Sequence, residues 1–313
     1  MHCLDEPTTA TDAHAWFFNR DVYQRHNGVA DAVVRVEHHD GDRIVGSLTG
    51  VVADGAWTSG HRAPYGGMDI VKASEPFASL AELARSTRIE LAARGVGTLR
   101  VRCRPNAYGR TERGAVHALL DAGFAVERCH VNHHIDVAAL ADVDDYLRGL
   151  SASARNMVRR GEALGLELQD AVGDVDWAEG YEVLQANKQA KGRSMSIGLD
   201  YLLGLRDAAP DVPRMVVLRQ AGGAACAAAL TYRVGPGVEL VVAWGDADHE
   251  LPRSPMNLLA LRLVERALAE GVGLLDLGIS SDGAGLLNPG LAFFKESVGA
   301  RPDLRFDLVL EGT

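Results

Sequence analysis

The 313-residue chain is short of cysteine, of aromatic residues and of long apolar runs, and these shortages exclude several classes of protein. Its four cysteines are widely scattered and form no CxxC pair, so neither a disulfide framework nor a zinc site is indicated. No apolar run reaches the ~18 to 20 residues that a membrane span requires. The first residues have neither the basic nor the apolar region of a signal peptide. We therefore expect a cytoplasmic protein without a membrane span.

The remaining composition is that of a globular protein. Hydrophobic residues make up 47% of the chain and charged residues 24%. The length favours about two domains, each large enough to bury a core. The formal net charge of -10 argues against a protein that coats a long nucleic acid, although it permits a small basic patch.

The chain contains an internal repeat at an offset of 176 residues. Residues 93–101 read ARGVGTLRV, and residues 269–277 read AEGVGLLDL. In both copies an apolar periodicity near 3.6 predicts a helix, which is followed by a Gly turn and a strand. Gly95 and Gly271 are placed where a helix C-cap favours a residue that tolerates positive φ. The same offset aligns Gly123 with Gly299, so we expect a duplicated α/β unit.

The predicted elements alternate between helix and strand, which is typical of a mixed sheet covered by helices. Strands are predicted at 32–36, 44–52, 98–102, 125–137, 166–170, 215–219, 224–234, 238–244, 274–278 and 304–310. Helices are predicted at 79–94, 142–165, 176–190 and 256–270. The polar helix over 142–165 is taken as the junction, giving domains at 1–140 and 141–313, with the last strand able to pack on the first domain.

Three segments, in order along the chain, carry a resemblance to a known family. They are APYGG at 63–67, LSASARNMVRRGEALG at 150–165, and LDLG at 275–278 followed by LAFFKESVG at 291–299. Together they resemble the Fem family of aminoacyl-tRNA-dependent transferases. The resemblance implies an α/β fold of two tandem GNAT-like domains with a cleft between them. It also implies an enzyme that moves an amino acid from aminoacyl-tRNA to an amine, with the tRNA as co-substrate and no other cofactor.

Lys295 is the first catalytic candidate. The repeat aligns it with Leu119, an apolar helix position, so the second copy has a charge where the first has none. A lysine at a helix edge can simply extend its ammonium to water. The resemblance instead implies that Lys295 stabilises the oxyanion formed when an amine attacks an ester, with Phe294 packing to position it.

Two groups of cations are candidates for binding anionic partners. Arg155, Arg159 and Arg160 share one face of a predicted helix and suit contacts with the phosphates of a tRNA acceptor end, although a solvated face is the alternative. Lys188, Lys191 and Arg193 form the second group. At a corresponding place the resemblance implies cations that hold an anionic acceptor. Lys191 stands where the family usually has arginine, so a bidentate contact is not expected there.

The other substrate-binding candidates follow from the same segments. They are Tyr65 and Gly66 in the Pro-Tyr-Gly-Gly segment, and Trp244 at the end of a predicted strand. Asp69 and Asp246 also follow strands, and either can serve as the general base that the attacking amine needs. Capping of a turn is the alternative for both.

Metal binding is not expected. The three histidines at 130, 133 and 134 lie on one predicted strand, and His133 faces away from the other two.

The donor is the remaining question. A CoA-dependent GNAT enzyme holds the pyrophosphate with small residues at a helix N-terminus. The corresponding stretch here is Arg253-Ser254-Pro255-Met256-Asn257-Leu258, with bulky residues at the small positions and a proline without an amide hydrogen. A second Gly-rich turn, containing Gly283 and Gly285, is interpreted as a flexible loop. These features favour aminoacyl-tRNA over CoA.

We therefore expect an aminoacyltransferase acting on a peptide-like acceptor, either a natural-product intermediate, as in antibiotic biosynthesis, or a cell-wall precursor. An acyl-CoA-dependent N-acyltransferase is the first alternative, and a non-catalytic binding protein is the second. The oligomeric state is left open.

Overall fold

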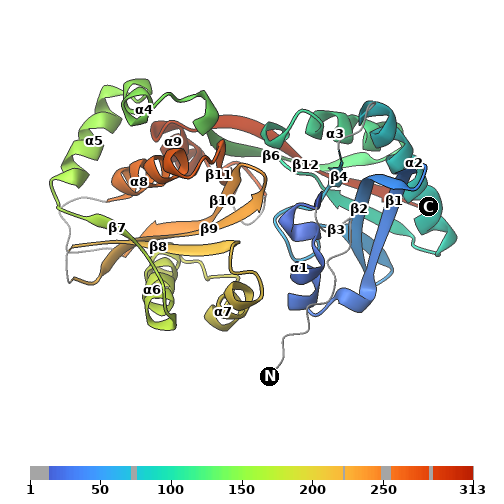
Figure 1. The fold of residues 1–313 in the computed structure, drawn as a ribbon, viewed down its shortest axis with the longest axis horizontal. Helices are drawn as coiled ribbons and strands as arrows, with labels where there is room; N and C mark the ends of the chain where they lie inside the picture. Colours follow the sequence, from blue (N-terminus) through green and yellow to red (C-terminus); the bar gives the residue numbers. More distant parts are fainter. Residues whose placement is uncertain (1–13, 72–75, 221–222, 248–254, 282–284, 313) are drawn as a thin grey trace. The chain divides into compact units, whose positions relative to one another are not determined.

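The computed structural model describes residues 14–71, 76–220, 223–247, 255–281 and 285–312 (Figure 1). The chain divides into two compact units. The first comprises the described residues up to His130 and from Leu304 onward, and the second comprises those from Val131 to Asp303. The boundary predicted from the sequence, at residue 140, lies ten residues after His130, where the first stretch of the first unit ends.

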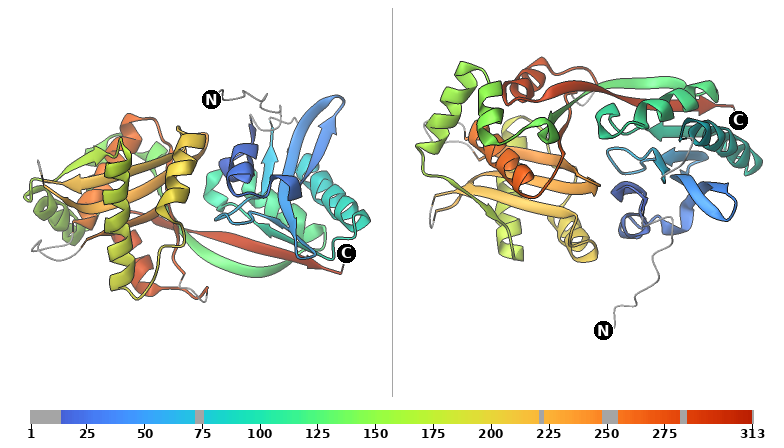
Figure 2. Two further views of the ribbon diagram at one scale, coloured as in Figure 1. Left: turned by 90° about the horizontal axis from the view of Figure 1, so that it is seen from below. Right: turned by 45° about the horizontal axis from the view of Figure 1, so that its top comes forward.

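The first unit is a mixed sheet with two helices packed against it. Its sheet runs in the order β1, β2, β3, β5, β12, with β4 also paired to β2, and only β3 and β5 pair in parallel. β12 lies beside β6 (Figure 2). Leu83 on α2 and Leu119 on α3 pack with Leu99 on β5 in one hydrophobic core. The elements are η2 (Phe17–Asn19), α1 (Asp21–His26), η3 (Ala30–Ala32), β1 (Val33–Asp40), β2 (Arg43–Ala53), β3 (Ala56–Ser59), β4 (Met68–Ile70), α2 (Pro76–Ala93), β5 (Thr98–Arg102), η4 (Asn106–Tyr108), α3 (Glu112–Asp121), β6 (Ala125–Asp136) and β12 (Arg301–Glu311). The second half of β6, from Val131, and the first three residues of β12 belong to the second unit.

The second unit is a sheet between two layers of helices. Its strands run in the order β6, β11, β10, β9, β8, β7, and only β10 and β11 pair in parallel. Helices α6 and α7 lie on one face, and α4, α5 and α8 lie on the other (Figure 1). The elements are η5 (Val137–Ala139), α4 (Val143–Gly149), α5 (Ala152–Glu162), β7 (Glu167–Asp170), α6 (Asp174–Ala190), α7 (Leu199–Ala208), β8 (Pro213–Arg219), β9 (Ala225–Gly235), β10 (Val238–Asp246), α8 (Met256–Ala269), β11 (Leu274–Ile279) and α9 (Pro289–Ser297).

The alternating α/β pattern and the repeat are confirmed. Gly95 and Gly271 both adopt positive φ, at 73° and 68°, where a helix turns into a strand. Gly123 and Gly299 do the same after the next helix, at 98° and 85°. These four positions require a left-handed backbone that glycine adopts without steric cost.

The single helix predicted over 142–165 is wrong. The chain forms two helices, because Leu150 has an extended backbone with ψ of 153°. The side chain of Ser151 then accepts a hydrogen bond from the Ala154 amide at 3.1 Å and starts α5 as its N-cap. A periodic polar pattern continues across this break, so the pattern alone did not reveal it.

The parallel pair of β10 and β11 is short, and this prepares the site. Val238–Leu240 of β10 pair with Leu274–Asp276 of β11, and the pairing ends there. Both strands continue beyond that point, β10 to Asp246 and β11 to Ile279.

Among the described residues, no helix is long and apolar enough to cross a membrane.

Candidate active site

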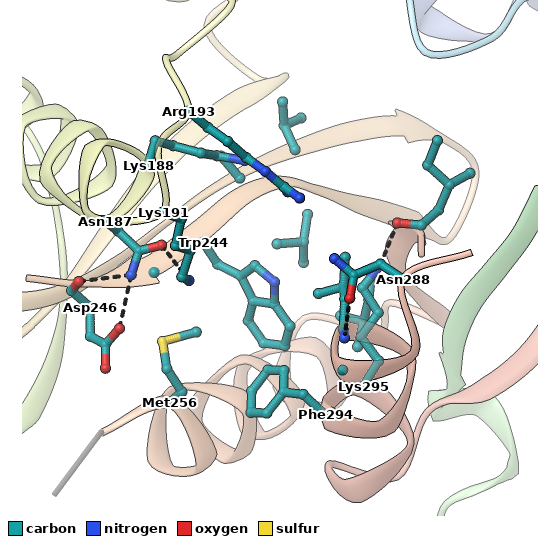
Figure 3. Close-up of a pocket in the computed structure, with 18 residues that line it drawn as sticks. Asn187, Lys188, Lys191, Arg193, Trp244, Asp246, Met256, Asn288, Phe294 and Lys295 are labelled. Carbon is teal, nitrogen blue, oxygen red and sulfur yellow. Dashed lines mark hydrogen bonds between the residues drawn. The ribbon is translucent and has the colours of Figure 1, made fainter. Parts of the chain in front are cut away.

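A cavity of the second unit lies where β10 and β11 have stopped pairing. Its volume is about 570 Å³, and residues from the ends of β10, β11 and α6 and from the start of α8 line it together with α9 (Figure 3). Seven of the ten residues named from the sequence as catalytic or substrate-binding surround the same space. The lining includes Lys188, Lys191, Arg193, Trp244, Asp246, Phe294 and Lys295.

Lys295 is buried at the wall of this cavity. Only 2% of its surface is exposed, and Nζ donates hydrogen bonds to the carbonyl oxygens of Gly278 and Ile279, both at 2.8 Å. Burial lowers the pKa of Lys295 to about 8, against the opposing attraction of Asp276, and Lys188 lowers it further. Two of the three N–H groups of the ammonium are therefore held by these carbonyls, and no acceptor for the third is found among the described residues.

Local sequence explains why both partners are in place. Asn288 caps α9 by accepting the Leu291 amide at 3.0 Å, and Pro289 occupies the first turn. Gly278 has φ of 74° and lies at an irregularity of the pairing between β11 and β6. A bulge of this kind redirects the backbone, and here it turns the carbonyls of Gly278 and Ile279 toward the Lys295 ammonium.

Aromatic side chains form another wall. The rings of Trp244 and Phe294 lie 5.4 Å apart between centroids and are inclined by 53°. Phe294 precedes Lys295 on α9, so its packing against β10 helps to set the orientation of that helix. Met256, at the start of α8, adds an adaptable apolar surface.

Cations gather at the end of α6. Lys188 is half-buried, and Lys191 and Arg193 are exposed. Burial lowers the pKa of Lys188, and Arg193 and Lys191 lower it further. Three cations near each other remain charged more easily when an anion is bound among them.

A hydrogen-bonded chain links these cations to the candidate base Asp246. Lys191 Nζ donates to Asn187 Oδ1 at 2.8 Å, and Asn187 Nδ2 donates to Asp246 Oδ1 at 2.9 Å. Asn187 Nδ2 also donates to the Asp246 carbonyl at 2.9 Å. The carboxylate therefore has a fixed orientation at the cavity wall.

Arg155, Arg159 and Arg160 do not line this cavity. Arg159 and Arg160 are exposed on α5, while Arg155 Nη1 donates to the carbonyl of Leu150 and, at 3.5 Å, to that of Arg148. Arg155 and Arg159 line a separate groove along α4 and α5. Arg155 thus satisfies the end of α4, and the other two guanidinium groups face solvent.

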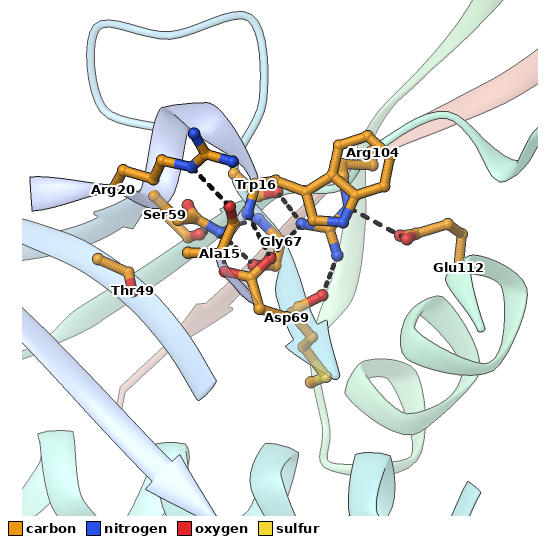
Figure 4. A network of polar contacts seen from close by, with 12 residues as sticks. Ala15, Trp16, Arg20, Thr49, Ser59, Gly67, Asp69, Arg104 and Glu112 are labelled. Atoms are coloured by element: carbon orange, nitrogen blue, oxygen red, sulfur yellow. Dashed lines mark hydrogen bonds and ion pairs between the residues drawn. The ribbon is translucent and has the colours of Figure 1, made fainter. Parts of the chain in front are cut away.

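The remaining candidates belong to the first unit and are buried. Asp69 accepts from Arg104 Nη1 at 3.0 Å and from Asn19 Nδ2 at 2.8 Å, and Arg104 also contacts Glu112 at 3.1 Å (Figure 4). Asp69 and Arg104 are 3% and 2% exposed, so this cluster is an interior ion-pair network. None of its members lines the cavity of the second unit.

Tyr65 and Gly66 are also interior residues. The Tyr65 hydroxyl lies 2.7 Å from that of Tyr108. A Cβ on Gly66 would fall 2.4 Å from the Gly60 amide nitrogen, so glycine is required there for close packing.

His130 and His133 on β6 contact different residues. His130 Nε2 lies 3.3 Å from Asp307, whereas His133 Nδ1 lies 2.8 Å from Ser280 Oγ. No group of three or more metal-ligating side chains occurs in the part of the chain that the structure covers.

The stretch considered for phosphate binding is described only in part. Arg253 and Ser254 lie outside the described residues, as does Gly283 of the Gly-rich loop. At the start of α8, Met256 and Leu258 are buried in the hydrophobic core. Bulky side chains therefore occupy the helix start where a pyrophosphate cradle has small residues.

Sequence reasoning missed the asparagines and Asp276. Asn187 orients Asp246, Asn288 caps α9, and Asn132 Nδ2 donates to Asp276 Oδ1 at 2.7 Å beside Lys295. The Asp276 carboxylate was visible in the repeat as a polar residue within an apolar strand. For the asparagines the sequence contained no comparable signal.

Comparisons with known proteins identify the fold. The structure of FemX has a TM-score of 0.72 with this chain at 11% identity, covering 98% of this chain and 96% of that one. The structure of L-PGS from Bacillus licheniformis has a TM-score of 0.57 at 14% identity, covering 90% and 85%. No protein-family model and no curated protein matches. The chain thus has a Fem-like fold of two tandem GNAT-like units, as the resemblance of its three segments implied.

Proposed function

We propose that this protein is an acyltransferase of the GNAT superfamily that forms an amide bond in the cavity beside Lys295. The observation that carries this proposal is a buried ammonium whose acceptors, the carbonyls of Gly278 and Ile279, leave one N–H for a ligand. A preorganised cation in a site shielded from water suits a reaction in which negative charge develops on oxygen.

In the proposed reaction an acceptor amine attacks the carbonyl carbon of an acyl ester. The new C–N bond forms as the carbonyl oxygen becomes an oxyanion, which Lys295 stabilises. Collapse of this intermediate breaks the ester C–O bond; the departing alkoxide takes a proton and leaves as a hydroxyl, while the attacking nitrogen loses a proton. Among the described lining residues Asp246 has the only carboxylate, and we assign it to accept the proton from nitrogen, because Asn187 holds it in a fixed orientation.

Aminoacyl-tRNA is the donor that we propose. The buried Met256 and Leu258 at the start of α8 support this choice, since they fill the place where small residues would admit a CoA pyrophosphate. Arg159 and Arg160 on α5 are the side chains we assign to phosphates of the acceptor end, because both are exposed.

The acceptor that we propose is a peptide-like amine carrying an anionic group. Lys188, Lys191 and Arg193 would neutralise the anion, and Trp244 with Phe294 would cover an apolar part of the same molecule. A natural-product intermediate and a cell-wall precursor both have this chemistry.

The test is direct detection of the amide. The protein is incubated with a panel of charged tRNAs and candidate anionic amines, and the products are read by mass spectrometry. We expect a new amide with the wild type and its near-complete loss with Lys295→Ala. Equal product from the Lys295→Ala variant would refute the role of Lys295, and product formed only with acyl-CoA would replace the proposed donor.

A further inference from the structure

The two carbonyls that hold Lys295 are themselves fixed by strand β6. The Val131 carbonyl accepts the Ser280 amide at 2.8 Å, directly after Ile279. Asp276 Oδ1 accepts both from Asn132 Nδ2 and from the Gly278 amide, each at 2.7 Å. The segment from Gly278 to Ile279 is therefore fastened at both ends.

His133 makes a further contact to this segment through its side chain. It is completely buried, and Nδ1 lies 2.8 Å from the hydroxyl of Ser280, which is also completely buried. On its other side Nε2 lies 3.5 Å from Glu296 Oε1, a long contact to the residue that follows Lys295. Neither His133 nor Ser280 lines the cavity, so neither touches a ligand there.

The surroundings favour the neutral form of this imidazole. Burial lowers the pKa of His133, and the nearby Lys295 lowers it further, although the contact with Glu296 acts in the opposite direction. A neutral imidazole has one donor and one acceptor nitrogen. The consistent arrangement has the Ser280 hydroxyl donating to Nδ1, while Nε2–H points to Glu296.

We propose that His133 is a positioning residue that acts through Ser280 to hold the Ile279 carbonyl against the Lys295 ammonium. The histidine thereby sets where the ammonium lies and how readily it carries its proton. The catalytic meaning of this role rests on the proposed function, but the contact itself does not. The charged groups that act on Lys295 are Asp276 from β11 and Lys188 from α6, and neither is altered by a change at His133.

Four variants separate this role from a general effect on packing. Ser280→Ala removes the hydroxyl. The longer side chain of His133→Gln places its amide where Nε2 lies rather than where Nδ1 lies, so it offers Ser280 no acceptor. His133→Asn places its amide near the position of Nδ1, so it retains an acceptor for Ser280. His134→Asn is the matched control on the same strand, because His134 Nδ1 has no hydrogen-bond partner among the described residues.

The measurement is the titration of the lysine side chains by NMR in each variant. The chain has only four lysines, at 72, 188, 191 and 295, so the Lys295 signal is assigned by its loss in Lys295→Met. A carbonyl acceptor favours the charged amine. We therefore expect the Lys295 midpoint, near 8 in the wild type, to fall by about one pH unit, or tenfold in proton affinity, in Ser280→Ala and His133→Gln. His133→Asn and His134→Asn should titrate like the wild type.

The result can fail independently of the proposed function, because the titration needs no substrate. An unchanged or raised midpoint in folded Ser280→Ala, or equal behaviour of His133→Asn and His133→Gln, would overturn the role of His133. Where transfer is measurable, we expect kcat to fall in Ser280→Ala and His133→Gln with little change in KM. Absence of transfer in the wild type would refute the proposed function and leave the titration result valid.

Discussion

Leu119 and Lys295 occupy the same place in the two copies of the repeat. Each lies in the last turn of a helix, and its carbonyl accepts the amide of the residue five positions on, Phe124 or Ala300, at 3.1 Å in both cases. Both side chains are buried, with 0% and 2% of their surface exposed. The architecture therefore places an apolar side chain here without difficulty, and the ammonium of Lys295 is the exception that needs a functional reason.

Replacing Lys295 with methionine tests how burial of the ammonium changes the free energy of unfolding. The unfolded lysine has its ordinary pKa of 10.5, whereas burial lowers the folded value to about 8. Between these values the unfolded state binds more protons, so the wild type should gain stability relative to Lys295→Met as pH rises from about 8 toward 10.5. The full gain is about 3 kcal/mol. Denaturant unfolding at several pH values measures it, and a constant difference between the two proteins would contradict it.

The pH dependence of transfer should reflect the same proton. With an acceptor amine that is already neutral at pH 7, we expect kcat to decline about tenfold per pH unit above pH 8, because the oxyanion loses its ammonium. In Lys295→Arg the rate should be lower and the alkaline decline absent, because arginine stays charged. A wild-type rate that holds up to pH 10 would show that the charge of Lys295 is not used.

The cations of α6 and of the segment after it should recognise the acceptor. We expect Arg193→Ala to raise KM for an anionic acceptor about tenfold, the effect of one charge-assisted contact, and to leave kcat nearly unchanged. Lys191→Ala should also lower kcat, because Lys191 holds Asn187 and through it Asp246. Steady-state kinetics with an acceptor lacking its anionic group serve as control, and equal effects on both acceptors would contradict the assignment.

Two arginines of α5 should differ in what they do. Arg160→Ala is expected to weaken tRNA binding and reduce the salt slope by about one, with stability unchanged, because the side chain is exposed. Arg155→Ala should instead lower the free energy of unfolding by about 1 kcal/mol, because it leaves the end of α4 without its donor. Filter binding across a salt series and denaturant unfolding measure the two effects. Loss of tRNA affinity only in Arg155→Ala would reverse the assignment.

The two candidate bases can be separated by isosteric changes. Asp69→Asn disrupts the buried pair with Arg104 and should cost about 3 kcal/mol of stability, while the folded protein keeps its transfer activity. Asp246→Asn should keep its stability and lose most of its activity, since the amide cannot accept the proton. Thermal unfolding and transfer assays on both variants decide which aspartate is the base. A stable but inactive Asp69→Asn variant would show that Asp69 takes part in the reaction.

Much of the architecture could be predicted because it is encoded locally. A helix periodicity and the glycine that ends the helix are set by a few neighbouring residues, as near Leu83 and Leu261. The sequence therefore predicted a duplicated α/β unit. The break at Leu150 and Ser151 was missed because two extended residues leave the surrounding periodicity intact.

The sequence by itself determined the repeat, the α/β class and the oddity of a lysine aligned with Leu119, since these depend on spacing and residue type. Only the tertiary structure decided which polar residues meet. It brings Lys188, Asp246 and Lys295 to one cavity and leaves Asp69 in an ion pair of the first unit. It also places His133 against Ser280, 147 residues away. Such contacts depend on strand pairing between distant segments, which no local pattern records.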